Sequence, residues 1–396
     1  MQTVKNVPQR KSGTSSTKVD PRYARSLVEQ VFREDMHAAR VLSLANGVVG
    51  VLHAAVLAVH AIGQAYAKVA NIQPRSGVKQ VDRFLSNDGL VMAQVLKSWV
   101  TFLVGVRKDI VVVLDWTDFE KDDHATLAAY LVTRHGRATP LVWHTVKKST
   151  LEGKRNGYEY DLIEQLHGYL DKDVEITLLA DRGFGDQKLY DYLSFLGWDF
   201  VIRFRGCIVV ESATGEAKPA KDWVPANGRA TRIRDARVTK NRARVPAVVV
   251  VHASKMKEAW CLATTLVDKK ASEVVKRYGR RFTIEETFRD EKDSRFGMGL
   301  SATHIRDAQR RDRLLLLAAV AYALLTLLGA ASEEAGLDRY LKVNTVKHRT
   351  HSLYRQGLYW YDCIPTMRED WLVPLMAAFD RIVQEHPVFR EIFGII

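Results

Sequence analysis

The amino-acid sequence predicts an α/β protein in which a helical region precedes a central sheet. Residues 20 to 105 carry apolar side chains at helical spacing. From residue 106 onward, short runs rich in β-branched residues alternate with helical segments. Residues 207 to 264 then add further strand-like segments before helices resume. We expect a helical domain over 20–105, an α/β domain over 106–335 and a helical C-terminal region over 336–396.

The order of strands and helices after residue 106 indicates which α/β fold the chain adopts. DIVVVLDWTDF is typical of a buried strand, and AAYLVTRHG and ATPLVWHTV follow as two strand candidates joined by a His-Gly-Arg turn. YDLIEQLHGYL is helical, VEITLLADRGF is a strand, GDQKLYDYLSFLG is a helix and WDFVIRFRG is a strand. Three strands, a helix, a strand, a helix and a strand is the order of a ribonuclease-H-like fold.

The helical region contains a candidate DNA-binding element. AIGQAYAKVANIQPRSGVKQVDRFLSN has the pattern of helix, short turn, helix, with Ser76 as the N-cap of the second helix. Lys79, Gln80 and Arg83 fall on its polar face. The pattern fits a helix-turn-helix that reads a DNA groove. It fits a plain helical bundle with a solvated polar face equally well.

Charge indicates the class of partner. The chain has 59 Lys and Arg against 46 Asp and Glu, a net charge of +13, which favours nucleic acid over a membrane surface. Residues 1–19 are polar and basic without an apolar core, so we expect a flexible tail that contacts phosphates and no secretory signal. LLLLAAVAYALLTLLGAA, residues 314 to 331, is long enough to cross a membrane, but it stands alone and is expected to be a buried core helix.

The cysteines indicate the cellular location. Cys207, Cys261 and Cys363 are far apart and form no zinc-binding pattern, so we expect reduced and mostly buried thiols. We expect a cytoplasmic protein.

Two acids lie where an α/β sheet places its ligands. Asp115 comes at the end of the first predicted strand, and Asp181 at the end of the fourth. Binding sites in such sheets gather at the carboxyl ends of strands. An Asp at a strand end can also be an ordinary turn former or helix N-cap, which leaves two interpretations open.

A third acid is selected by helical geometry. In YGRRFTIEETFRDEKDSRFGMGL, residues 278 to 300, a continuous helix places Tyr278, Arg281, Glu285 and Lys292 within an arc of about 60°, with Arg289 close beside it. Glu286 falls off this stripe and is expected to be a solvated or structural acid. Three carboxylates can hold two divalent metal ions that activate a nucleophile and stabilise a leaving oxygen. The alternative is a helix whose charges form ordinary salt bridges.

The sequence Tyr-x2-Arg-x3-Glu-x6-Lys, at positions 278 to 292, resembles the YREK signature of bacterial insertion-sequence transposases of the DDE type. LDWTDF, LADRGF, EAWCLATTL, IEETFRDEK and RFGMGL resemble blocks of that family in the same order, and the resemblance extends from about residue 40 to 350. It is greatest to the cut-and-paste subgroup of the family numbered four among insertion sequences.

The resemblance implies roles for individual residues. Asp115, Asp181 and Glu285 would be the catalytic triad that binds two Mg²⁺ ions, with Mn²⁺ as a substitute. DNA at the transposon end would be held by four basic or aromatic side chains, namely Tyr278, Arg281, Lys292 and Arg289. Trp260 would stack on a base flipped from a DNA hairpin, although it is also placed like a core tryptophan on a strand.

The resemblance also implies a reaction and partners. The enzyme would nick the element end, form and open a hairpin, and join the element to target DNA. Its partners would be double-stranded terminal inverted repeats, target DNA and a second copy of the chain in a synaptic complex, with no membrane. Two alternatives are a ribonuclease-H-fold nuclease that does not transpose and a domesticated DNA-binding protein without catalysis.

Two further regions leave their role open. The insertion over 207–264 includes seven Lys or Arg between residues 229 and 244, a pattern that predicts a strand with one cationic face. This face would clamp the hairpin, or it would protect an exposed sheet edge with charge. The C-terminal region would contribute DNA contacts or dimerisation.

Overall fold

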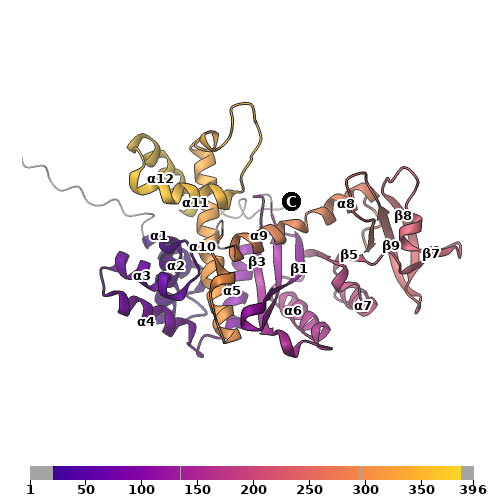
Figure 1. Ribbon diagram of the computed structural model, residues 1–396, viewed down its shortest axis with the longest axis horizontal. Helices are drawn as coiled ribbons and strands as arrows, with labels where there is room; N and C mark the ends of the chain where they lie inside the picture. The colour runs from indigo at the N-terminus through magenta and orange to yellow at the C-terminus, as the bar shows by residue number, and fades with distance from the viewer. Residues whose placement is uncertain (1–20, 134, 294–296, 385–396) are drawn as a thin grey trace, which may run out of the picture.

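The computed structural model describes residues 21–133, 135–293 and 297–384 of the 396-residue chain (Figure 1). The predicted basic tail over 1–19 lies outside the described residues, as does the end of the C-terminal region after residue 384.

Helices occupy both ends of the described part of the chain and the connections of the central sheet. The α-helices are α1 (Pro21–Phe32), α2 (Ala38–Ala54), α3 (Val59–Ala70), α4 (Pro74–Leu85), α5 (Met92–Val104), α6 (Arg155–Tyr169), α7 (Gln187–Phe195), α8 (Ala271–Gly279), α9 (Phe282–Lys292), α10 (Ala308–Glu334), α11 (Leu353–Cys363) and α12 (Glu369–Gln384). The strands are β1 (Asp109–Phe119), β2 (His124–Val132), β3 (Ala138–Lys147), β4 (Glu175–Ala180), β5 (Asp199–Phe204), β6 (Val209–Glu211), β7 (Ala217–Pro219), β8 (Thr231–Val238), β9 (Ala243–Val251) and β10 (Trp260–Thr264).

The ten strands form one mixed sheet in the order β3-β2-β1-β4-β5-β10-β9-β8-β6-β7. β1, β2 and β3 form an antiparallel meander, while β4 and β5 run parallel to β1. The parallel strands need crossover connections, which α6 and α7 supply. The predicted order of strands and helices is confirmed, and the mixed α/β architecture is compatible with a ribonuclease-H-like core.

The predicted β insertion continues the main sheet instead of forming a separate one. β10 pairs with β5, and β9, β8, β6 and β7 follow outward, away from the N-terminal helices (Figure 1). Strand β8 alternates buried and solvent-facing residues, and Asp235, at φ 49°, shifts this alternation by one residue. Arg232, Arg234 and Arg237 consequently all avoid the buried side. Some of this charge is already compensated, because Arg237 and Arg242 pair with Glu211.

Residues 20–105 are helical, as predicted, but α4 begins earlier than expected. Gln73 is its N-cap and Pro74 occupies the first position, so Ser76 lies inside the first turn and is not the cap. Proline is favoured at the first position because its φ suits a helix and its missing N–H has no partner there. Lys79, Gln80 and Arg83 are exposed, as the pattern predicts. Whether this face reads DNA stays a prediction.

The apolar run over 314–331 lies within the longer helix α10. By length and composition α10 could cross a membrane, as could the bent pair α2–α3 if it were one span, but 94% of the apolar window of α10 is buried inside the protein. α10 packs against α2, β3, α11 and α12. The approach of α11 requires glycine, because a Cβ at Gly357 would lie 1.8 Å from the carbonyl oxygen of Leu325.

The C-terminal region returns to the start of the chain. Tyr23 on α1 donates a hydrogen bond to Asp380 on α12 and makes an edge-to-face contact with Phe379, with 5.0 Å between ring centroids. The cysteines are free, and Cys207 is exposed, in contrast to the expectation that they are mostly buried. It lies in the turn after β5, where the chain leaves the core.

Candidate functional site

Two carboxylates meet where β1 and β4 stop pairing. The parallel register of these strands ends at the pair Leu114 and Ala180, so Asp115 and Asp181 are the next residues along the two neighbouring strands. Asp115 does not end its strand as predicted, because β1 continues to Phe119 as the antiparallel partner of β2. Only β4 ends at this point, so from Asp115 onward β1 no longer pairs with a described strand on that side.

The turn after β4 fixes Asp181. Its Oδ1 accepts a hydrogen bond of 2.7 Å from the backbone N–H of Gly183, and it caps the short 3-10 helix Arg182–Phe184. The N-cap interpretation of this acid is therefore correct. It does not conflict with a role in a site, because a carboxylate has a second oxygen.

Arg281 joins the third acid to the first. Its Nη1 donates to Asp115 Oδ2 at 2.9 Å, and its Nη2 pairs with Glu285 on α9. The Arg281 side chain is 8% exposed, whereas that of Glu285 is 46% exposed. Glu285 thus reaches solvent while its partner is held inside.

The predicted continuous helix from 278 to 292 is wrong. α8 ends at Gly279 and α9 begins at Phe282, with Arg281 as its N-cap. Glycine has a low helix propensity, which helps explain why the chain breaks there. Tyr278 and Glu285 therefore belong to different helices, and Arg281, at the start of α9, interacts locally with both.

Tyr278 and Trp260 pack against each other. Tyr278 is 1% exposed, and burial raises its pKa to about 12. Its ring lies edge-on to that of Trp260, with 5.0 Å between centroids, and Trp260 also contacts Phe282. Trp260 is half-buried at the start of β10. In this conformation Tyr278 and Trp260 both have a packing role, which was the alternative predicted for Trp260. Contact of either side chain with DNA stays a prediction.

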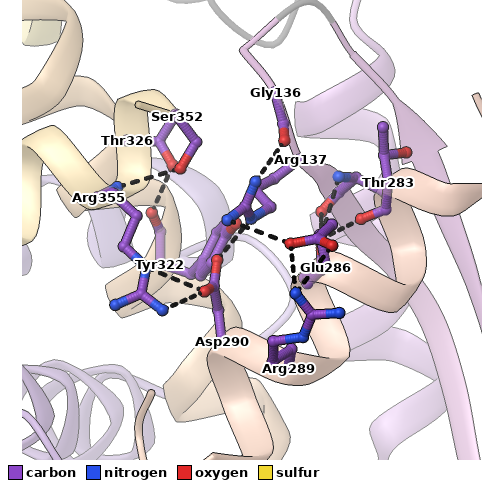
Figure 2. Close-up of polar contacts among 12 residues, drawn as sticks. Gly136, Arg137, Thr283, Glu286, Arg289, Asp290, Tyr322, Thr326, Ser352 and Arg355 are labelled. Carbon is purple, nitrogen blue, oxygen red and sulfur yellow. Dashed lines mark hydrogen bonds and ion pairs between the residues drawn. The ribbon is translucent and has the colours of Figure 1, made fainter. Parts of the chain in front are cut away.

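The remaining two predicted cations lie in different surroundings. Lys292 Nζ donates to Thr117 Oγ1 at 3.1 Å and to the carbonyl oxygen of Asp118 at 2.6 Å, at the far end of β1. Burial lowers the pKa of Lys292. Arg289, four residues after Glu285 on α9, pairs through its guanidinium with Glu286 at 3.0 Å (Figure 2), and its contact with DNA stays a prediction.

The site has three acids, Asp115, Asp181 and Glu285, around the cation Arg281. The pKa of Asp115 is raised to about 6, mainly by burial and also by the like charges of Asp181 and Glu285, although Arg281 opposes the rise. Three carboxylates around one guanidinium leave negative charge in a partly desolvated place. An additional cation would offset that charge.

The donor set suits a hard divalent ion, since Mg²⁺ prefers carboxylate oxygens and water. Within the described residues, however, no three His, Cys, Asp or Glu side chains come close enough together to hold a metal ion. Arg281 lies between Asp115 and Glu285 and pairs with both. The donor types therefore suit the ion, but in this conformation Asp115 and Glu285 are engaged by Arg281 and do not form a metal site.

Sequence reasoning missed a fourth acid beside the site. Glu159 on α6 is 6% exposed and accepts a hydrogen bond of 2.9 Å from Trp116 Nε1. The backbone N–H of Trp116 in turn donates to Asp115 Oδ1 at 2.9 Å. Burial raises the pKa of Glu159. Nothing in the helical pattern of YDLIEQLHGYL distinguishes this glutamate, because its importance depends on a tryptophan 43 residues away.

Comparison with known proteins gives the family. The model of the transposase DDE domain matches residues 107–324, which is more than half of the chain and covers the sheet, α9 and the three acids. No curated protein matches the sequence. DDE transposases act on DNA, cleave it and transfer strands, and they generally use divalent metal ions. The chain belongs to the family of proteins with a transposase DDE domain.

Proposed function

We propose that this protein is a cut-and-paste DNA transposase of the fourth insertion-sequence family, with Tyr278, Arg281, Glu285 and Lys292 as its YREK residues. The observation that carries the proposal is the register of β1 and β4, which places Asp115 and Asp181 side by side. Glu285 is connected to them through the ion pairs of Arg281.

In this proposal Asp115, Asp181 and Glu285 hold two Mg²⁺ ions, which Mn²⁺ can replace. The bound ions supply activation of a water or a 3′-hydroxyl and stabilisation of the leaving oxygen. Glu159 fixes the Trp116 ring, and the neighbouring backbone N–H orients the Asp115 carboxylate.

Arg281 has two successive partners. Without DNA its guanidinium neutralises Asp115 and Glu285. With DNA bound, the same guanidinium turns to the phosphate at the cleaved strand, because a planar fork of donors matches phosphate as well as carboxylate. Lys292 supplies a second positive charge, and Trp260 stacks on the flipped base of the hairpin.

The remaining parts of the chain serve the DNA. We propose that residues 20–105 bind the terminal inverted repeats, that the arginines of the 207–264 insertion clamp the hairpin, and that two copies work together in a synaptic complex on the bacterial nucleoid. The alternatives are a nuclease of the same fold that cuts without transposing and a DNA-binding protein that does not cut.

The test is cleavage of a DNA end taken from the sequence that flanks this protein's own gene. Purified wild type, Glu285→Ala and Glu286→Ala are incubated with this DNA and Mg²⁺. We expect a hairpin-sized product from wild type and Glu286→Ala, and none from Glu285→Ala. Glu286 is the matched control because it is the next residue, and its ion pairs with Arg289 and Arg137 are partly exposed.

Each other outcome selects a different function. Cleavage without a hairpin or strand transfer indicates the nuclease. Binding without any cleavage in Mg²⁺ or Mn²⁺ indicates the non-catalytic protein. Full activity of Glu285→Ala contradicts the assignment of this acid.

A further inference from the structure

A cleft lies apart from the three acids, between the turn that joins β2 to β3 and the start of α11. Its volume is about 500 Å³. Hydrogen-bond donors dominate its lining, which includes Arg137, Thr350, His351, Ser352, Arg355 and Tyr359. None of the described residues that line the cleft is acidic.

A buried carboxylate holds the two arginines of this cleft in place (Figure 2). Asp290 on α9 is 1% exposed, and its Oδ2 accepts from Arg137 Nε at 2.6 Å. Its Oδ1 accepts from Arg355 Nε at 3.0 Å and Nη2 at 2.7 Å. The guanidiniums are thus ordered before any ligand arrives, which reduces the entropy that binding would cost.

The charges form a row across one side of α9. Figure 2 shows Arg289, Glu286, Arg137, Asp290 and Arg355 in that sequence, joined by ion pairs. Three arginines alternate with two acids, so the row has one excess positive charge. The arginine side chains are 63%, 16% and 27% exposed, whereas that of Asp290 is 1% exposed. Glu286 is 40% exposed and pairs with Arg137 and Arg289, so solvent reaches three cationic side chains and one anionic side chain in this row.

Arg355 retains a donor for a ligand, whereas each guanidinium nitrogen of Arg137 already has an acceptor within the protein. Arg355 bonds Asp290 through Nε and Nη2, and a guanidinium has one more nitrogen, Nη1, for a further acceptor. The cleft is also next to the first turn of α11, where Ser352 is the N-cap. Backbone N–H groups and the positive end of the helix dipole add to the attraction for an anion there.

We propose that this cleft binds a backbone phosphate of DNA. Glu285 and Asp290 are five residues apart on α9, about 140° around the helix axis. The proposed contact thus lies on another side of α9 from the catalytic acids, and one DNA duplex would engage both sides of the helix. The inference rests on the proposed function, since it assigns a further contact to the DNA of that reaction.

The test places a negative charge in the cleft without removing either arginine. Thr350 is exposed, and Thr350→Glu gives Arg355 a carboxylate where the phosphate would lie. Binding of a fluorescent duplex with the element end is measured by anisotropy over a range of salt concentrations. We expect about tenfold weaker binding and a salt slope smaller by about 1, the value for one lost phosphate contact.

Thr366→Glu is the matched control. Thr366 is exposed in the turn after α11, at the other end of that helix, so the variant has the same change of charge outside the cleft. We expect wild-type affinity and slope from it, and we expect both variants to keep the wild-type thermal midpoint.

An unchanged salt slope in Thr350→Glu would overturn the inference, as would an equal change in both variants. A second arm replaces DNA with inorganic phosphate and follows the thermal midpoint. Stabilisation by phosphate that Thr350→Glu abolishes, together with an unchanged DNA slope, would make the cleft a small-anion site and refute the DNA contact. These outcomes leave the proposed function intact if wild type still cleaves the DNA end, whereas absence of DNA binding by wild type refutes both.

Discussion

Two charge clusters on different sides of α9 have opposite compositions. In one, the single cation Arg281 pairs with Asp115 and Glu285, and Asp181 is near enough to raise the pKa of Asp115. In the other, the buried acid Asp290 accepts hydrogen bonds from Arg137 and Arg355, and the more exposed Glu286 pairs with Arg137 and Arg289. The first cluster has more acids than cations, and the second has more cations than acids.

This difference means that a further cation would offset unbalanced charge in the first cluster but not in the second. Around Arg281 a divalent ion would relieve repulsion between carboxylates that the protein holds together. Around Asp290 the carboxylate is fully occupied, and its arginines connect α9 to the β2–β3 turn and to α11. The second cluster therefore fixes the orientation of the helix that presents Glu285.

The largest expected effect comes from Asp290→Ala. Removing this acid leaves two partly buried guanidiniums without their shared partner, and we expect a loss of about 3–5 kcal/mol in the free energy of unfolding. Urea denaturation measures it. Glu286→Ala, which breaks only partly exposed pairs, should cost less than about 1 kcal/mol. Equal losses in the two variants would remove the distinction between a structural and a surface cluster.

Glu291 sharpens the same comparison, because it lies next to Asp290 but has no arginine. It is 5% exposed, Tyr130 donates to it at 3.2 Å, and burial raises its pKa to about 8. The folded state keeps this proton while the unfolded carboxyl, with its ordinary pKa, loses it. Stability from Glu291 is therefore complete below the unfolded pKa and declines as pH rises to about 8.

The decline can reach about 1.4 kcal/mol per pH unit. Glu291→Gln cannot titrate, so its stability relative to wild type should increase between pH 5 and pH 8. Urea denaturation at several pH values tests this, with the half-exposed Glu286→Gln as control. A constant difference between Glu291→Gln and wild type would mean that Glu291 is ionised in the folded protein at neutral pH.

A smaller effect is expected from Arg281→Gln. Without its guanidinium, Asp115 and Glu285 repel each other in metal-free buffer, and stability should fall by about 1–2 kcal/mol. Mg²⁺ should then stabilise this variant more than wild type, because the ion no longer competes with Arg281. Thermal unfolding with and without Mg²⁺ measures the difference. Arg289→Gln is the control, and an equal Mg²⁺ shift in all three proteins would show that Arg281 does not occupy the cation's place.

Much of the site's location could be predicted from the sequence. The β-branched runs gave the strands in the correct order because strand periodicity is local. The acids in LDWTD and LADRG followed from those strands, since residues after paired parallel strands emerge at the same edge of the sheet. Helical spacing favoured Glu285 over Glu286, and the structure places Glu285 with Asp115 but Glu286 with Arg137 and Arg289.

Local patterns failed where distant contacts decide the conformation. The spacing of Tyr278 and Lys292 suggested one helix, but the chain breaks before Arg281, which then bonds across 166 residues to Asp115. Glu159 and Asp290 had no distinguishing pattern, because their partners lie far away in the sequence.

The sequence by itself determined the order of strands and helices along the chain and the excess of positive charge, because composition and period are properties of short segments. Only the tertiary structure decided which charges become buried and which partners they receive. Burial removes water, and the free energy of a charge then depends on the few side chains that replace it. For this protein that dependence distinguishes Glu285, which can still accept a cation, from Asp290, which already has two.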